Sequence, residues 1–288
     1  MPTSGTSGTA GQPFALEVDR LSFAYGSKRV LHEVSFGVAK GGICGLFGPN
    51  GSGKTTLFRC CIGLQKPLGG VVRVNGINAA GMDIAERARH MAYVPQERKP
   101  GFPFLVREIV AMGRTPHLGG FAFSRLSAKD KDIVHRAIHA AGIHDLADEP
   151  CTALSGGQRQ LAYLARAIAQ GASLMLLDEP TSALDFSNQM LVWQALARIA
   201  QSGVAVVVCC HDPNHILWFC DSAAVLHEGR LLAYGPSGTS LSESVLRTLY
   251  GDKLEIRTVD GKPFVRPLQE GNVSGNREEA SRFCYTGR

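Results

Sequence analysis

The sequence predicts an α/β fold in which a mostly parallel sheet is interrupted by a helical insertion. Residues 173–179 (SLMLLDE) and 204–210 (VAVVVCC) are apolar runs of strand length, and residues 186–200 between them have the pattern of a helix. Uninterrupted apolar strands that alternate with helices are typical of a parallel sheet covered on both faces. Residues 97–170 are helical in character, and residues 14–41 alternate as antiparallel strands do. We therefore expect an N-terminal antiparallel β subdomain and an α-helical subdomain inserted in the α/β core.

Length and composition exclude several classes of protein. With 288 residues the chain can bury one large core, or a core with a subdomain. Its 44% hydrophobic content is that of an ordinary globular protein. No apolar run approaches the roughly 20 residues of a transmembrane helix, and the first residues lack the pattern of a secretion signal, so we expect neither a membrane span nor secretion. The net charge of +5 does not argue for a nucleic-acid partner.

The eight cysteines do not indicate a metal site. No two of them form a CxxC pair, and Cys60 with Cys61 and Cys209 with Cys210 are neighbours in apolar surroundings. Buried thiols of this kind are typical of proteins in a reducing compartment. We expect reduced, buried cysteines in a cytosolic protein.

The N-terminal part of the chain is expected to contain a tail followed by strands. Residues 1–13 are rich in Ser, Thr and Gly and have no charged side chain, which is typical of a flexible tail. Strands are expected over residues 14–26, 30–41, 43–48 and 71–76. A glycine-rich loop follows the third of these strands and leads into a helix expected over residues 54–63. This region supplies the antiparallel subdomain and the first strand of the core.

Capping residues and turn residues mark the later elements. Ser127 is expected to cap a helix, with Asp130 three residues on, and an apolar face continues to Gly142. Residues 222–235 and 253–267 read as strand pairs, turning at Glu-Gly and Asp-Gly respectively. We expect one folded unit over residues 14–268 and a disordered tail over 269–288.

The glycine-rich loop GPNGSGKT (residues 48–55) fits G-x-x-x-x-G-K-[ST] without a mismatch, after a strand and before a helix. Its backbone N–H groups and the helix N-terminus are suited to phosphates, while Lys54 can reach the terminal phosphates and the Thr55 hydroxyl can bind Mg²⁺. The motif predicts the core of a P-loop NTPase and the cofactors ATP and Mg²⁺. The expected ATP-binding residues of the loop are Gly48, Pro49, Asn50, Gly51, Ser52, Gly53, Lys54, Thr55 and Thr56.

The apolar run SLMLLDE supplies the second part of a nucleotide site. Asp178 emerges at the end of this strand, where ligands bind in open α/β sheets, and it can hold Mg²⁺ through water. Glu179 follows at once and is placed to polarise the water that attacks the γ-phosphate. Hydrolysis of ATP, and not binding alone, is therefore expected.

The loop LSGGQ (residues 154–158) is a second phosphate-type loop without a lysine, ahead of a helix expected over residues 161–170. With the two motifs above, it makes the sequence resemble the ATP-binding cassette family over about residues 14–236. In this family the loop contacts the γ-phosphate of ATP held by the opposite subunit. The resemblance implies an ATP-dependent homodimer, with this role for Ser155, Gly156, Gly157 and Gln158.

The same resemblance implies further roles. Tyr25 matches the aromatic that stacks on adenine, and Gln96 matches the glutamine that links the magnesium site to the helical subdomain. Asp185 matches the loop that communicates across the dimer, and His211 matches the histidine that contacts the γ-phosphate. The catalytic set is thus Glu179, His211, Lys54 and Gln96, and the magnesium set is Thr55, Gln96 and Asp178. His211 and His215 could instead form a metal pair, but the intervening Asp-Pro-Asn favours a turn and a helix start.

Three classes of cassette protein compete. A single cassette without a long coiled coil disfavours a translation factor or a DNA-repair protein and favours the motor subunit of a transporter, peripheral on the inner face of the cell membrane. The implied partners are two transmembrane permease subunits and, indirectly, a substrate-binding protein. Residues 103–120 (PFLVREIVAMGRTPHLGG) resemble the segment of iron–siderophore, haem and cobalamin importers. Zinc, manganese, molybdate or tungstate importers remain alternatives.

The subunit that hydrolyses ATP does not contact the transported solute, so no residue here encodes the solute pocket. The apolar residues Phe102, Phe104 and Leu105 are candidates to receive the coupling helix of a permease. Their alternative is the ordinary core of the helical subdomain.

Overall fold

The computed structural model describes residues 14–96, 102–118, 126–182, 184–259 and 262–268. The two expected tails, residues 1–13 and 269–288, lie outside the described residues, as does the Asp-Gly turn at 260–261.

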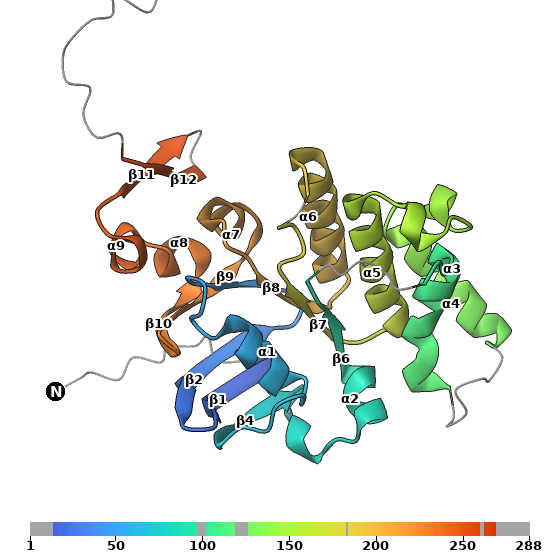
Figure 1. Ribbon diagram of the computed structural model, residues 1–288, viewed down its shortest axis with the longest axis horizontal. Helices are drawn as coiled ribbons and strands as arrows, with labels where there is room; N and C mark the ends of the chain where they lie inside the picture. Colours follow the sequence, from blue (N-terminus) through green and yellow to red (C-terminus); the bar gives the residue numbers. More distant parts are fainter. Residues whose placement is uncertain (1–13, 97–101, 119–125, 183, 260–261, 269–288) are drawn as a thin grey trace, which may run out of the picture.

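A mostly parallel sheet forms the centre of the described molecule (Figure 1). Its strands, in spatial order, are β10 (Arg230–Pro236), β9 (Ser222–His227), β3 (Ile43–Phe47), β8 (Ala205–Cys209), β7 (Leu174–Asp178) and β6 (Met91–Val94). The pairings from β9 to β6 are parallel, and only β10 is antiparallel to its neighbour. The carboxyl ends of the parallel strands therefore meet at one edge.

Both faces of this sheet are buried, which explains its uninterrupted apolar strands. Along β8, Val206 and Val208 pack into one hydrophobic cluster, while Val207 and Cys209 pack into the cluster on the other side. Successive side chains of a strand point to opposite faces, so each residue must be apolar when both faces are covered. The predicted α/β core is confirmed.

A second, antiparallel sheet covers one side of the core. It contains β2 (Lys28–Ala39), β1 (Phe14–Tyr25), β4 (Gly69–Val74) and β5 (Ile77–Asn78), in that order. Alternate residues of β1, such as Leu16 and Val18, are buried, as the period of two requires. Helix α1 (Lys54–Cys61) lies above this sheet in Figure 1.

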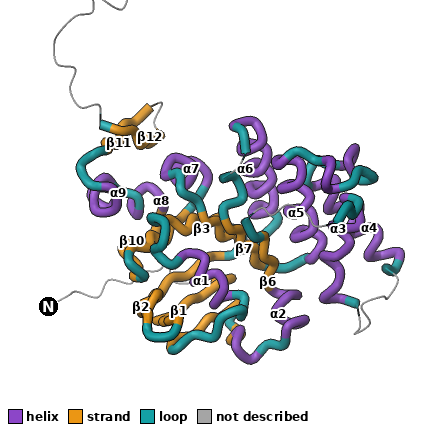
Figure 2. The backbone as a smooth tube through the Cα atoms, viewed as in Figure 1, coloured by secondary structure: helices purple, strands orange, loops and turns teal. Residues whose placement is uncertain are grey.

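A group of helices is inserted between β6 and β7, as the sequence predicts, and Figure 2 shows it at the opposite end of the molecule from the antiparallel sheet. We call it the helical subdomain. Its elements are α3 (Val106–Ala111), η2 (Met112–His117), α4 (Ala128–Ala140), η3 (His144–Leu146), η4 (Cys151–Ala153) and α5 (Gly156–Gln170). Ser127 and Asp130 form the expected capping box at the start of α4.

The remaining helices flank the sheet or follow it. They are η1 (Ala79–Gly81), α2 (Ile84–His90), α6 (Phe186–Gln201), α7 (Pro213–Phe219), α8 (Ser237–Ser240) and α9 (Glu243–Tyr250). The sequence reasoning did not predict α2, α8 and α9, nor the strand β6. The last strands, β11 (Leu254–Val259) and β12 (Lys262–Pro267), pair with each other as predicted.

The cysteines of the described residues are buried, as expected. Those residues contain no cluster of His, Cys, Asp and Glu suited to a metal ion. His215 is buried with its ring against Trp193, while His211 contacts Glu179. In the part of the chain that the structure describes, every helix is too short or too polar to cross a membrane.

Candidate active site

The glycine-rich loop connects β3 to α1 in a backbone shape that only glycine adopts readily. Gly48, Gly51 and Gly53 have φ angles of 147°, 81° and 106°. At Gly48 a Cβ atom would lie 2.1 Å from the carbonyl oxygen of Leu226, so a side chain is also excluded for lack of space. The loop thereby lies at the edge of the sheet where the parallel strands end, with a backbone shape suited to binding an anion.

Lys54 is the first residue of α1 and lies under this loop. Its side chain is 6% exposed, and its Nζ donates to the carbonyl oxygens of Gly48 at 2.7 Å and Pro49 at 3.0 Å. Burial lowers the pKa of the ammonium below its usual value. The loop therefore holds a partly desolvated cation at a fixed place, which strengthens its attraction for an anion.

Thr55 and Asp178 meet beside the lysine. The Asp178 carboxylate is buried at the end of β7 and accepts a hydrogen bond from the Tyr93 hydroxyl at 3.4 Å, while the side chains of Thr55 and Cys209 favour its charged form. Burial is the largest effect on this carboxyl and raises its pKa. A hydroxyl and a carboxylate are hard oxygen donors, so these residues fit a Mg²⁺ ion shared with phosphates.

Glu179 is held by side chains from two neighbouring strand ends. Its Oε2 accepts from Gln96 Nε2 at 3.1 Å, and its Oε1 contacts His211 Nε2. Gln96 follows β6, Glu179 follows β7 and His211 follows β8, and these three strands are adjacent in the sheet. Glu179 also has a φ of 52°, a conformation that non-glycine residues rarely adopt. The structure thus orients this carboxylate from both sides.

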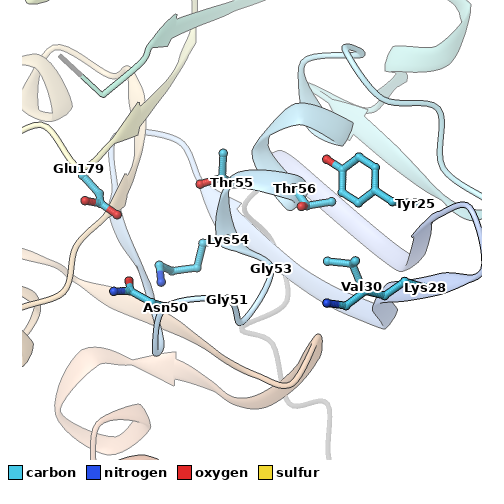
Figure 3. Close-up of a pocket in the computed structure, with 10 residues that line it drawn as sticks. All are labelled: Tyr25, Lys28, Val30, Asn50, Gly51, Gly53, Lys54, Thr55, Thr56 and Glu179. Atoms are coloured by element: carbon cyan, nitrogen blue, oxygen red, sulfur yellow. The ribbon is translucent and has the colours of Figure 1, made fainter. Parts of the chain in front are cut away.

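A cavity of about 340 Å³ joins the loop to this carboxylate. Figure 3 shows Tyr25 and Glu179 at its two ends, with Lys54 and Thr55 between them. Tyr25 is 43% exposed at the end of β1. The residues that line the cavity are Tyr25, Lys28, Val30, Asn50, Gly51, Gly53, Lys54, Thr55, Thr56 and Glu179.

Residues 155–158, which we call the signature loop, do not belong to the residues that line this cavity. The expected helix start at residue 161 is wrong, because α5 begins at Gly156. Ser155 Oγ accepts from the Gln158 N–H at 3.2 Å, and Gln158 Oε1 accepts from the Ser155 N–H at 3.0 Å. This capping box satisfies two backbone donors, so the glycines enter the first turn of the helix.

Asn188 connects the signature loop to Asp185. A Cβ atom on Gly157 would lie 2.4 Å from Asn188 Cγ, so glycine is needed for this contact. Asp185 caps α6 and accepts from both the backbone N–H and the side-chain amide of Asn188, at 2.8 and 2.9 Å. The two regions that the sequence assigns to the dimer contact are therefore neighbours in one chain.

The sequence reasoning missed Tyr93, Cys209 and Asn188. Cys209 lies beside Asp178 in the register of β8 and β7, which a prediction of that parallel pairing could have found. Phe102 and Phe104, the expected docking residues, are 69% and 43% exposed, and Leu105 is partly buried.

Comparison with known proteins agrees with this geometry. The ABC transporter family matches residues 31–182 of the chain. The hemin import ATP-binding protein HmuV of Pseudomonas putida is 38% identical over 82% of this chain and 92% of its own length. A Helicobacter pylori relative, named as a probable iron chelatin transport ATP-binding protein, is 37% identical over 88% of this chain and 99% of its own.

A solved structure supports the same assignment. An ABC transporter assigned to the metal-chelate type, solved in an inward-facing conformation, has a chain that is 30% identical to this one with a TM-score of 0.77. The match covers 89% of this chain and 98% of the other. The chain therefore belongs to the ABC transporter family, and it is an ATPase of that family.

Proposed function

We propose that this chain is the motor subunit of an importer for a metal chelate, of the iron–siderophore, haem or cobalamin type. The observation that carries the enzymatic part is the Glu179 carboxylate, held between Gln96 and His211 at one end of the cavity that Lys54 and Thr55 line. A carboxylate fixed in this way can orient and polarise a water molecule for attack on a phosphate.

The aromatic ring, the glycine-rich loop and the lysine of the cavity have proposed parts in binding ATP. Tyr25 stacks on the adenine, and the backbone of residues 48–56 with the Lys54 ammonium holds the phosphates. Thr55 and Asp178 would hold Mg²⁺, with Gln96 as a further contact. When bound, the ion neutralises charge on the phosphates. His211 and Gln96 keep the Glu179 carboxylate directed at the water.

We further propose that the site is completed by a second copy of the chain. Ser155, Gly156, Gly157 and Gln158 begin a helix of 15 residues, and such an N-terminus favours an anion. The signature loop does not line the cavity of its own chain. In this proposal it therefore contacts a phosphate of the ATP that is bound to the opposite copy. Asp185 then contacts the partner, and closure of the dimer is transmitted to two permease subunits.

The relatives support the choice of cargo and of location. Hemin, iron chelatin and metal chelates appear in the names of the proteins that this chain is similar to. Exposed Phe102 and Phe104 fit a docking place for a permease helix. A cytoplasmic position on the inner face of the membrane, with a substrate-binding protein outside, follows from this role. A zinc, manganese, molybdate or tungstate importer is the alternative.

The cargo is tested by identifying the neighbouring genes and screening the adjacent solute-binding protein against siderophores, haem, cobalamin and oxyanions. The proposal expects a multi-span permease gene nearby and selective binding of a metal chelate. Selective binding of an oxyanion would show that the transported solute is an oxyanion and not a metal chelate. Neighbouring ribosomal or repair genes without a permease gene would contradict the transport role.

The catalytic part is tested by Glu179→Gln. Hydrolysis of ATP should fall by about 10²–10⁴, the range of general acid–base catalysis, while ATP binding remains. Unchanged hydrolysis would remove Glu179 from the catalytic set.

A further inference from the structure

The segment GRTPH (residues 113–117) packs on the C-terminal end of α5, whose N-terminal end carries the signature loop. Gly113 lets the two backbones touch, because a Cβ atom there would lie 2.2 Å from the carbonyl oxygen of Arg166. Only glycine fits at this position, and its small size lets η2 pack directly on α5.

Arg114 joins three elements of the helical subdomain. The residue is 8% exposed; its Nη1 donates to the carbonyl oxygen of Ala169 at 2.8 Å, and its Nε donates to Asp130 at 3.0 Å. The Ala169 carbonyl is one of the last four of α5, which have no partner within the helix. Asp130 in turn accepts from Ser127 in the capping box of α4. One guanidinium thus connects η2, α4 and α5.

Two further hydrogen bonds hold the same end of α5. His117 Nε2 donates to the carbonyl oxygen of Gln170 at 2.8 Å. The Gln170 amide donates to the carbonyl oxygens of Ala88 at 2.5 Å and Met91 at 2.8 Å, where α2 passes into β6. The C-terminal end of α5 is therefore fixed both to the helical subdomain and to the central sheet.

The geometry points to Arg114 as a positioning residue for the signature loop. Helix α5 has 15 residues and is about 22 Å long, so a tilt of about 5° at its fixed end moves the signature loop by about 2 Å. A shift of this size is enough to spoil the contact of Ser155 and Gly157 with a phosphate. This inference rests on the proposed role of the signature loop in closing the dimer.

The inference is tested in the Glu179→Gln chain, which should accumulate as the ATP-bound dimer. Arg114→Lys and Asp130→Asn are added separately, and Asn at 130 keeps an oxygen for the capping box. We expect the dissociation constant of the dimer, measured by light scattering with ATP and Mg²⁺, to rise about tenfold, within the usual range of coupling through packed networks. ATP affinity of the monomer, measured by titration, should stay unchanged.

The matched control is Arg136→Gln. Arg136 pairs with Asp132 on the same helix α4 at 3.1 Å, but both side chains are more than 60% exposed (68% and 63%), so its loss should leave both constants unchanged. All variants are compared at a temperature at which circular dichroism shows them folded. Asp130→Asn, which keeps the bond to Ala169, carries the test if Arg114→Lys does not fold.

The outcomes separate two failures. Dimer formation by the Arg114 and Asp130 variants equal to that of their parent would overturn the positioning role, as would a parallel loss of ATP affinity and dimer formation. Failure of the Glu179→Gln parent itself to form an ATP-dependent dimer would contradict the proposed function instead.

Discussion

The two glycine-containing loops of this chain use glycine for different reasons. In the loop of residues 48–55, Gly48, Gly51 and Gly53 have positive φ angles, so glycine supplies a backbone shape. In the signature loop, Gly157 lies in the first turn of a helix, and glycine supplies space against Asn188. The first loop has a backbone shape suited to holding phosphates, and the second is the start of a helix.

The two loops also differ in what surrounds them. The first has its cation, its hydroxyl and its carboxylate within one cavity of the same chain. The second has an internal capping box and no part in that cavity. The difference supports our proposal that one half-site binds ATP by itself, while the other acts on a nucleotide brought by another copy.

Replacement of the lysine should give the largest effect on ATP binding and should affect the first half-site alone. Lys54→Ala removes a hydrogen-bonding cation from the phosphates, which corresponds to about a 100-fold loss of ATP affinity. Titration of the monomer with a fluorescent ATP analogue measures this. Ser155→Ala serves as the comparison and should bind the analogue as the parent does; equal losses in the two variants would erase the distinction between the half-sites.

Replacement of the signature glycine should affect dimer formation and spare ATP binding. Gly157→Ala places a methyl group against Asn188, and overpacking of this kind costs about 1–3 kcal/mol, which corresponds to a rise of about fivefold or more in the dissociation constant of the ATP-bound dimer. Light scattering of the variant in the Glu179→Gln chain measures it. Gly81→Ala, where open space surrounds the added Cβ atom, is the control.

A second substitution sharpens this result. Asn188→Ala removes the amide group, whose Cγ and Oδ1 would lie 2.4 and 2.5 Å from the new methyl group, and leaves the Asn188 Cβ at 2.8 Å, so the double variant should recover part of the lost dimer formation. No recovery would show that Gly157 is needed for a reason other than space against Asn188.

The pH dependence of ATP binding should come from the first half-site. Burial lowers the pKa of Lys54, and a bound phosphate raises it again because it favours the charged ammonium. Affinity is therefore complete below the pKa of the free protein and falls as the pH rises toward the pKa of the complex. Titrations at rising pH should show this loss at a lower pH than an ordinary lysine gives, and Lys54→Arg should abolish it. A loss that persists in the arginine variant would assign the titration to another group.

The smallest effect is expected for the thiol beside the Mg²⁺ residues. Cys209→Val removes a weak donor to Asp178, so the Mg²⁺ requirement for ATP hydrolysis should rise only about twofold. Cys209→Ser, which keeps a donor, is the control and should remain close to the parent. A rise in the Mg²⁺ requirement of about 100-fold, as large as the loss of ATP affinity expected for Lys54→Ala, would mean that the Cys209 thiol is essential to the Mg²⁺ site.

Features encoded by contiguous residues were predictable from the sequence. The other strands of the core, the loop of residues 48–55 and the capping box at Ser127 each depend on a local pattern, whereas β6, a strand of four residues, was not predicted. The contact of Glu179 with Gln96 and His211 depends on the order of β6, β7 and β8, which no local pattern specifies. For the same reason Asn188 and Arg114 were missed, since the partners of each are on other helices.

The predicted start of α5 at residue 161 was wrong for a local reason. Gly156 and Gly157 have low helix propensity, which suggested a loop, but the reciprocal hydrogen bonds of Ser155 and Gln158 begin the helix before them. Helix α9 was missed because its apolar stripe is short and follows a strand pair.

The mass of the Glu179→Gln chain in solution with ATP and Mg²⁺ tests the central claim most directly. Two unlike half-sites on one chain predict a dimer that binds two ATP molecules, forms only with ATP and is weakened by Gly157→Ala. An ATP-bound chain that remains monomeric at every concentration tested would contradict the shared site.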